Sequence, residues 1–147
     1  MKIFRILWVD DEIDYLKPHI LFLENKNYKV FTCNNGLDAI QILKNQQIDV
    51  VLLDENMPGL NGIETLTELK KNNPEVSVIM ITKNEEEWLM DEAIGYKTDN
   101  FLTKPVNPSQ ILLACKEILD SSKIWNDKIT EKYLNDFQML NSQIQNI

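Results

Sequence analysis

Four places in the chain carry polar side chains directly after an apolar, strand-like run. These residues are Asp10 with Asp11, Asp54, Thr82, and Lys104 followed by Pro105. The carboxyl ends of parallel strands lie along one edge of a sheet, so we expect these residues, far apart in sequence, to meet there. Three carboxylates, a hydroxyl and an ammonium group in one crevice would suit a divalent cation and a phosphoryl group.

The carboxylates of Asp10, Asp11 and Asp54 would repel one another in such a crevice. At an effective dielectric constant of about 20, two like charges ~4 Å apart repel by about 4 kcal/mol. The cluster therefore needs a cation, and hard carboxylate and carbonyl oxygens select Mg²⁺. Asp54 could then act as a nucleophile and form an aspartyl phosphate, while Thr82 and Lys104 contact the phosphoryl oxygens.

Alternating strand and helix patterns position these residues. Apolar runs predict strands at 3–9, 28–33, 48–53, 76–81 and 99–103, and helical periodicity predicts helices at 14–26, 36–46, 62–72, 84–95 and 107–121. The second and fifth runs are the most polar, as edge strands should be. With right-handed crossovers the order becomes 2-1-3-4-5, a flavodoxin-like, doubly wound α/β fold. Pro18 lies in or just past the first turn of a helix that starts near Asp14, or it kinks that helix.

Two domains are expected, a sheet domain over residues 1–121 and an amphipathic helical extension over 122–147. The extension carries apolar residues at steps of three or four, namely Trp125, Ile129, Tyr133, Phe137, Leu140, Ile144 and Ile147. This stripe either folds back on the sheet domain, pairs with a second copy as a dimerisation helix, or begins a helical bundle that is cut off at residue 147.

Composition narrows the class of protein and of partner. The 147 residues include 44% hydrophobic ones, which is typical of a packed core, and the net charge is −8 without a basic run. That charge argues against nucleic acid or an anionic membrane as the direct partner. No transmembrane helix or signal peptide is visible. Cys33 and Cys115 are expected to be buried, reduced thiols of a cytoplasmic protein, and the single histidine, His19, argues against a histidine-rich metal site.

The chain resembles the response-regulator receiver domains of two-component signalling. The segments that carry this resemblance are 9–12 (VDDE), 53–59 (LDENMPG), 80–82 (MIT) and 101–105 (FLTKP). The resemblance implies that Asp54 accepts a phosphoryl group from a sensor histidine kinase or a phosphotransfer protein. It also implies that Asp11, Asp54 and the backbone carbonyl of Asn56 bind Mg²⁺ directly, with Asp10 acting through water.

The resemblance further implies a switch rather than an enzyme. Lys104 would bond the phosphate, Thr82 would move toward it, and Phe101 would follow as the aromatic switch residue; the Lys104–Pro105 bond is usually cis in such domains. The surface of the fourth helix, fifth strand and fifth helix would change. The expected output is dimerisation through that surface or the C-terminal helix, or release of the C-terminal extension. Only Mg²⁺-dependent self-phosphorylation and slow autodephosphorylation are expected as chemistry.

Two residues depart from the usual receiver pattern. Lys83 stands where a small residue is common, and Glu55 follows the phosphoacceptor. Our hypothesis is that Lys83, paired with Glu55, partly covers the phosphoryl group and alters its lifetime; a solvated Lys–Glu pair is the alternative.

A narrower resemblance joins the chain to PorX-type regulators of type IX secretion in the Bacteroidetes. It is carried by segments 6–14 (ILWVDDEID), 16–24 (LKPHILFLE) and 81–87 (ITKNEEE). In that group a helical bundle and a domain similar to alkaline phosphatases follow the receiver, so residues 123–147 would begin the bundle, and Lys83 would be a trait of the subgroup.

Three other functions compete with the switch. A phosphohydrolase of the haloacid-dehalogenase type has a second Asp two residues after its nucleophile, where this chain has Asn56. A flavodoxin-like FMN carrier needs a phosphate loop after its first strand, where Asp10 and Asp11 would instead repel phosphate. A pseudo-receiver that never takes phosphate is disfavoured because every acceptor residue is present.

Overall fold

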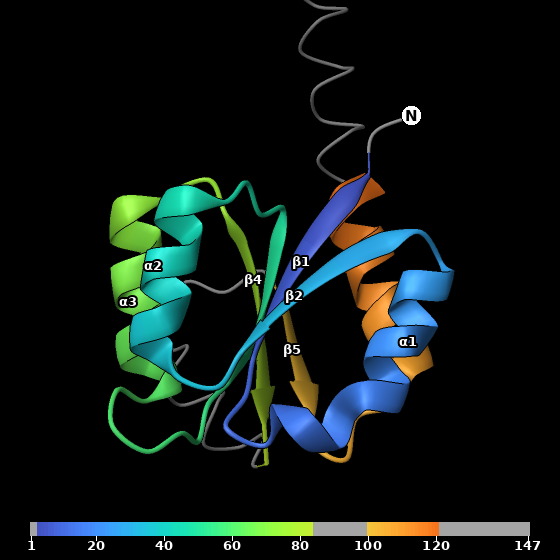
Figure 1. Ribbon diagram of the computed structural model, residues 1–147, viewed down its shortest axis with the longest axis horizontal. Helices are drawn as coiled ribbons and strands as arrows, with labels where there is room; N and C mark the ends of the chain where they lie inside the picture. The colour runs from blue at the N-terminus through green and yellow to red at the C-terminus, as the bar shows by residue number, and fades with distance from the viewer. Residues whose placement is uncertain (1–2, 84–99, 121–147) are drawn as a thin grey trace, which may run out of the picture. The chain divides into compact units, whose positions relative to one another are not determined.

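The computed structural model describes residues 3–83 and 100–120 of the chain. In this described part, five parallel strands form one sheet with the order β2-β1-β3-β4-β5 (Figure 1). The strands are β1 (Phe4–Val9), β2 (Tyr28–Cys33), β3 (Val50–Asp54), β4 (Ser77–Thr82) and β5 (Asn100–Thr103). The predicted order is confirmed, and each predicted strand agrees with the observed one to within two residues. The expected helix over 84–95 and the extension over 122–147 lie outside the described residues.

Burial explains why the strands take this order. Every residue of β3 is buried, and so are the last four residues of β1 and the last five of β4. The edge strands β2 and β5 are only partly buried. Strands that are covered on both faces need apolar side chains on both faces, whereas an edge strand tolerates polar ones.

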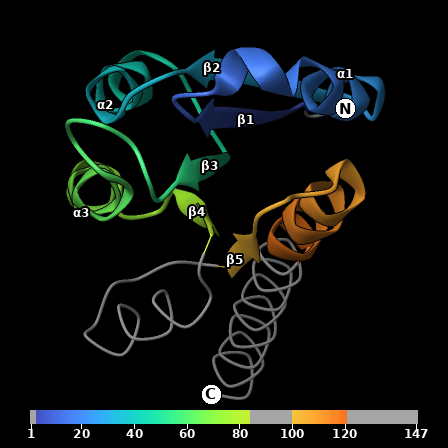
Figure 2. The same cartoon turned by 90° about the horizontal axis from the view of Figure 1, so that it is seen from below.

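Helices cover both faces of the sheet (Figure 2). Helices α2 (Gly36–Asn45) and α3 (Gly62–Asn72) lie on one face, and α1 (Lys17–Asn25) lies on the other. Residues 108–120 are also helical. The core on the α2–α3 side joins alternate residues of the central strands, such as Leu7, Val51 and Met80, to Ala39 of α2 and Leu66 of α3.

The first helix differs from the prediction in where it starts. A short 3₁₀ turn, η1 (Ile13–Leu16), precedes α1, which begins at Lys17. Pro18 therefore lies in the first turn of α1, where a helix has no use for a backbone N–H and the proline costs nothing. The predicted α-helical start near Asp14 is wrong by about one turn.

Side-chain caps define where the other helices begin. The side chain of Asn35 accepts a hydrogen bond from the backbone N–H of Asp38 at the start of α2. Asn61 and Glu64 form a reciprocal capping box at the start of α3. These caps fix where α2 and α3 begin, and therefore where the loops after β2 and β3 end.

Candidate functional site

The exits of four strands meet as the sequence predicted. Asp10 follows β1 and Asp54 ends β3, and these two strands are neighbours in the sheet. The helices that follow them, α1 and α3, pack on opposite faces of the sheet. Thr82 ends β4 and pairs in register with Thr103 of β5. The backbone N–H of Lys104 donates to the carbonyl of Thr82 over 2.8 Å, which carries Lys104 to the same edge.

Three carboxylates gather at the exits of β1 and β3. Asp10, Asp11 and Asp54 each offer an oxygen, and these oxygens all lie within 4.8 Å of one another. Asp10 and Asp54 are buried and Asp11 is exposed. The backbone N–H of Glu12 donates to Oδ1 of Asp10 over 2.8 Å, which orients that carboxylate. The cluster thus has the hard oxygen donors and the unbalanced negative charge that fit Mg²⁺.

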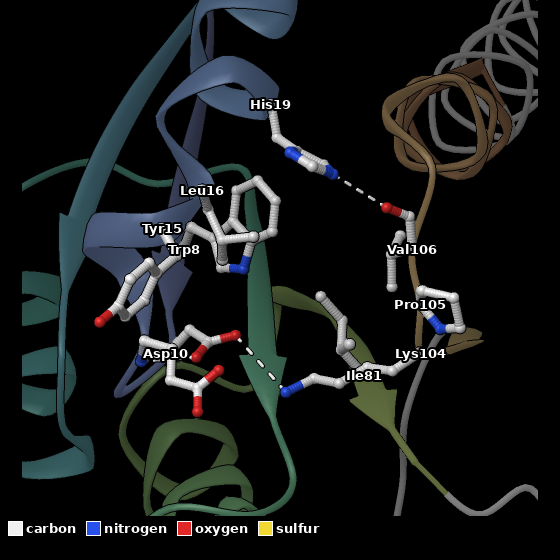
Figure 3. A pocket seen from close by; sticks show the side chains of 10 residues that line it. Trp8, Asp10, Tyr15, Leu16, His19, Ile81, Lys104, Pro105 and Val106 are labelled. Atoms are coloured by element: carbon white, nitrogen blue, oxygen red, sulfur yellow. Dashed lines mark hydrogen bonds and ion pairs between the residues drawn. The ribbon is translucent and has the colours of Figure 1, made fainter.

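Lys104 partly balances this charge. Its Nζ lies 3.2 Å from Oδ1 of Asp54. The same nitrogen lies 3.7 Å from Oδ2 of Asp10, and a dashed line marks this ion pair in Figure 3. Burial alone lowers the pKa of Lys104, but the carboxylates of Asp54 and Asp10 outweigh burial and raise it above its usual value. Lys104 is therefore a permanent cation at neutral pH.

Asp54 is a buried carboxylate with only one of its two oxygens paired within residues 3–83 and 100–120. Burial, followed by the charge of Asp10, raises its pKa to about 6. Its Oδ1 accepts from the backbone N–H of Asn56 over 3.2 Å and contacts Lys104. Its Oδ2 is buried and has no hydrogen-bond partner in the described part of the chain. A buried carboxylate oxygen without a partner is costly, and no hydrogen bond from the described residues competes with a cation or a phosphoryl group for this one.

The remaining predicted site residues lie around this centre. Thr82 is buried at the end of β4, and Asn56 is exposed in the loop after β3. Phe101 is half-buried on β5 and packs against the core on the α2–α3 side.

Glu55 is half-buried and Lys83 is exposed at the exits of the adjacent strands β3 and β4. The Lys104–Pro105 peptide bond is cis, as the resemblance implied.

The two cysteines, Cys33 and Cys115, are not part of the acidic cluster. Both are free thiols, but Cys33 is half-buried rather than buried, because it lies on the edge strand β2. Burial raises the pKa of Cys33 to about 11 and that of Cys115 to about 12. Both thiols are therefore protonated at neutral pH and weak nucleophiles.

One residue that sequence reasoning missed is Gly62, at the start of α3. A Cβ atom at this position would lie 2.5 Å from Cα of Glu55 and 2.6 Å from the carbonyl oxygen of Asp54. Only glycine lets α3 begin this close to the phosphoacceptor segment. The signal was available, since a glycine directly after a capping residue at a helix start suggests close backbone approach.

The sequence matches the response regulator receiver domain over residues 6–116. The chain belongs to this family. Receiver domains of response regulators accept phosphoryl groups from histidine kinases and act as phosphorylation-dependent switches. This membership decides against the phosphohydrolase and FMN-carrier alternatives.

In residues 3–83 and 100–120, no helix of the receiver domain is both long and apolar enough to cross a membrane.

Known proteins agree with this assignment. A CpxR homolog of Haemophilus influenzae, a transcriptional regulatory protein, is 37% identical over 135 residues, which cover 90% of this chain and 58% of that protein. A CheY-like receiver domain from Methanospirillum hungatei superposes with a TM-score of 0.76 at 28% identity, covering 83% of this chain and 98% of that one. The chain therefore spans nearly all of the Methanospirillum hungatei domain but little more than half of the longer Haemophilus influenzae protein.

One similar structure is that of a response regulator in complex with Mg²⁺-BeF. The response regulator TrrA of Thermotoga maritima, in complex with Mg²⁺-BeF, superposes with a TM-score of 0.69 at 26% identity. The match covers 78% of this chain and 98% of TrrA.

Proposed function

We propose that this receiver domain takes a phosphoryl group on Asp54 from the phosphohistidine of a sensor kinase or a phosphotransfer protein. The observation that carries the proposal is the buried Oδ2 of Asp54, which has no partner in the described residues while Lys104 holds the other oxygen. This arrangement leaves one oxygen of the Asp54 carboxylate without a competing hydrogen bond from the described part of the chain.

Mg²⁺ is the cofactor that the acidic cluster would hold. Its ligands would be Asp11, Asp54 and the backbone carbonyl of Asn56, with Asp10 acting through water. When bound, the metal supplies positive charge that offsets the repulsion between carboxylates and phosphoryl oxygens. The similar TrrA structure, solved with Mg²⁺-BeF, supports this assignment.

Asp54 and Lys104 have different roles in the phosphoryl transfer. Oδ2 of Asp54 forms the new bond to phosphorus as the bond between phosphorus and the donor nitrogen breaks, and the imidazole of the donor keeps that electron pair and takes a proton from solvent. Lys104, already 3.2 Å from Asp54, contacts the phosphoryl oxygens as a fixed cation. The hydroxyl of Thr82 then contacts a phosphoryl oxygen of the aspartyl phosphate that has formed. Slow hydrolysis of the aspartyl phosphate by water returns the domain to its resting state.

The output of phosphorylation would be a change in the shape of one surface of the domain. Phosphorylated Asp54 would carry close to two negative charges and new acceptor oxygens, so Thr82 would move inward and Phe101 would follow. The surface that changes comprises the predicted helix over 84–95, β5 and the helix that follows it. We propose homodimerisation through this surface or through the predicted extension over 122–147 as the consequence.

The narrower assignments also belong to this proposal. The PorX-type motifs support a regulator in which residues 123–147 begin a helical bundle. A cytoplasmic location follows from the need to meet a kinase, and the net charge of −8 supports a domain that does not itself contact nucleic acid. Lys83, with Glu55, would set the lifetime of the phosphate; an unchanged dephosphorylation rate in Lys83→Ala would remove that role.

Phosphorylation by a small donor tests the acceptor directly. The chain is incubated with acetyl phosphate and Mg²⁺, and its mass and size are measured before and after. The expected result is a gain of one phosphoryl group that Asp54→Asn lacks and the matched surface variant Asp38→Asn retains. Labelling that persists in Asp54→Asn, or rapid turnover of a generic phosphate ester, would contradict the proposal.

A further inference from the structure

A cavity of about 430 Å³ opens beside the acidic cluster, on the α1 side of the sheet. Apolar side chains from β1, η1 and the segment after β5 form most of its wall, and Asp10 and Lys104 form its polar end (Figure 3). Glu12 also lines the cavity. This volume falls within the range of small-molecule sites, which combine an apolar wall with a few polar groups. The cavity lies on the face of the sheet opposite α2 and α3.

The walls of this cavity are held in place. His19 of α1 forms a hydrogen bond from its Nε2 to the carbonyl oxygen of Val106 over 2.9 Å, and so ties the helix to the segment after β5. The ring of Trp8 packs edge-on against His19, with centroids 6.1 Å apart and planes at 76°. These contacts span the cavity and oppose its collapse.

The cavity contains a hydrogen-bond donor without a partner. Trp8 is 1% exposed, and its indole Nε1 is buried with no hydrogen-bond partner among residues 3–83 and 100–120. In Figure 3 the indole nitrogen lies on the edge of the ring that faces the Asp10–Lys104 end. A buried donor that is left unpaired is unfavourable, so an acceptor atom inside the cavity would stabilise it.

The charge and the aromatic walls select the kind of molecule. Two carboxylates, Asp10 and Glu12, face one ammonium group, and that ammonium is already paired with Asp10 and Asp54. The exposed ring of Tyr15 favours a flat molecule and attracts a cation. We propose that the cavity binds a planar aromatic cation whose ring carries a hydrogen-bond acceptor. The acceptor meets the indole N–H of Trp8 and the cation meets Asp10 and Glu12.

This site does not require Asp54 to be phosphorylated, but it would influence that reaction. Asp10 belongs both to the cavity and to the proposed metal site. The aromatic cation and Mg²⁺ should therefore weaken each other's binding by the same factor. This consequence, unlike the site itself, rests on the proposed function.

Titration of the whole, metal-free chain with 3-methoxybenzamidine tests the site. The indole N–H signal of Trp8, identified by its loss in Trp8→Phe, should shift saturably in nuclear magnetic resonance spectra. The neutral analogue 3-methoxybenzamide should bind several-fold more weakly, and 3-ethylbenzamidine, which lacks the ether oxygen, should move the indole signal less. Equal binding of amidine and amide, or no saturable shift of the Trp8 signal, would overturn the proposal.

Two kinds of variant locate the ligand. Val106→Phe fills the cavity while keeping the carbonyl group that His19 contacts, so it should abolish binding; Leu16→Phe is the second filling variant if the first does not fold. Glu12→Gln should weaken amidine binding by up to about fivefold, as for an exposed ion pair. Amidine binding that survives both filling variants would refute the cavity as the site. Acetyl phosphate labelling is measured in parallel, so failure of the ligand site and failure of the phosphorylation switch are separate results.

Discussion

The ammonium nitrogen of Lys104 lies 3.2 Å from Oδ1 of Asp54, although β4 separates their two strands in the sheet. Lys104 reaches across the end of β4, and its backbone N–H is held by the carbonyl of Thr82. The phosphoacceptor, the switch hydroxyl and the cation are thus mechanically linked at one edge. A change in the charge or position of Asp54 therefore acts directly on Lys104 and on the segment that follows β5.

Removal of the Lys104 charge should slow phosphorylation. In Lys104→Met we expect a 10- to 100-fold lower rate with acetyl phosphate, because a hydrogen bond to a charged group contributes ~1.5–3 kcal/mol. The pKa of Asp54 should also rise further above 6, since Lys104 now opposes the effects of burial and Asp10. Rates from mass spectrometry and the carboxyl titration followed by magnetic resonance check both effects. The control Lys44→Met, on α2, should leave both unchanged.

Ionised Asp54 should destabilise the metal-free protein at pH 7, and this contribution should disappear as the pH falls toward 4. The pKa of Asp54 is raised from 3.8 to about 6 in the folded state, so its ionisation opposes folding above pH 6 and this cost disappears below pH 4. Asp54→Asn should therefore stabilise the protein by up to about 3 kcal/mol at pH 7 and by little at pH 4. Urea unfolding in the presence of a chelator measures this difference. A stabilisation that does not change with pH would contradict the assignment to Asp54.

Excess Mg²⁺ should remove most of that pH dependence. A cation bound to the carboxylates offsets their repulsion and favours ionised Asp54, and a ligand that binds only the folded state raises the free energy of unfolding. We expect the melting temperature of the wild-type protein at pH 7 to rise with Mg²⁺ concentration. Asp11→Asn, which removes an exposed carboxylate of the cluster, should reduce that rise, whereas the distant Asp38→Asn should not.

Gly62→Ala should damage both folding and the site. The added Cβ would meet the backbone of Asp54 and Glu55 at 2.5–2.6 Å, so α3 or the phosphoacceptor segment must shift, at a cost of about 1–3 kcal/mol. Unfolding experiments and acetyl phosphate labelling should both show the loss. Gly59 is the matched control: it has a φ of +76°, and a Cβ at this position would meet no atom within 4 Å. Gly59→Asn, which introduces a residue that tolerates this conformation, should therefore cost much less.

Thr82→Ala should separate phosphorylation from its consequence. Asp54 and Lys104 are intact in this variant, so labelling should persist, but the hydroxyl that draws the end of β4 inward is gone. We expect the phosphorylated variant to lose the change in size or self-association that the phosphorylated wild type shows in light scattering. Thr82→Ser, which keeps the hydroxyl, should retain that change. Loss of labelling in Thr82→Ala would show that Thr82 acts in the transfer itself.

Much of the fold and the site could be predicted from the sequence because both follow from local patterns. Alternating apolar runs and helical periodicity determined the elements, and the polarity of β2 and β5 determined the edges of the sheet. Once the order was known, the exits of β1, β3, β4 and β5 had to lie on one edge. The error at the start of α1 was also local, since η1 and an α-helical turn have similar apolar spacing and only the backbone hydrogen bonds distinguish them.

Only the tertiary structure decided how these groups contact one another. The pairing of Lys104 with both Asp10 and Asp54, the unpartnered Oδ2 of Asp54 and the close approach at Gly62 depend on ångström-scale packing. The cavity beside the site depends on it too, because its walls are joined by a hydrogen bond between His19 and Val106, which are 87 positions apart. Periodicity reports which face of an element is buried, but it carries no information about which distant side chain packs there, how close it comes, or where a space is left.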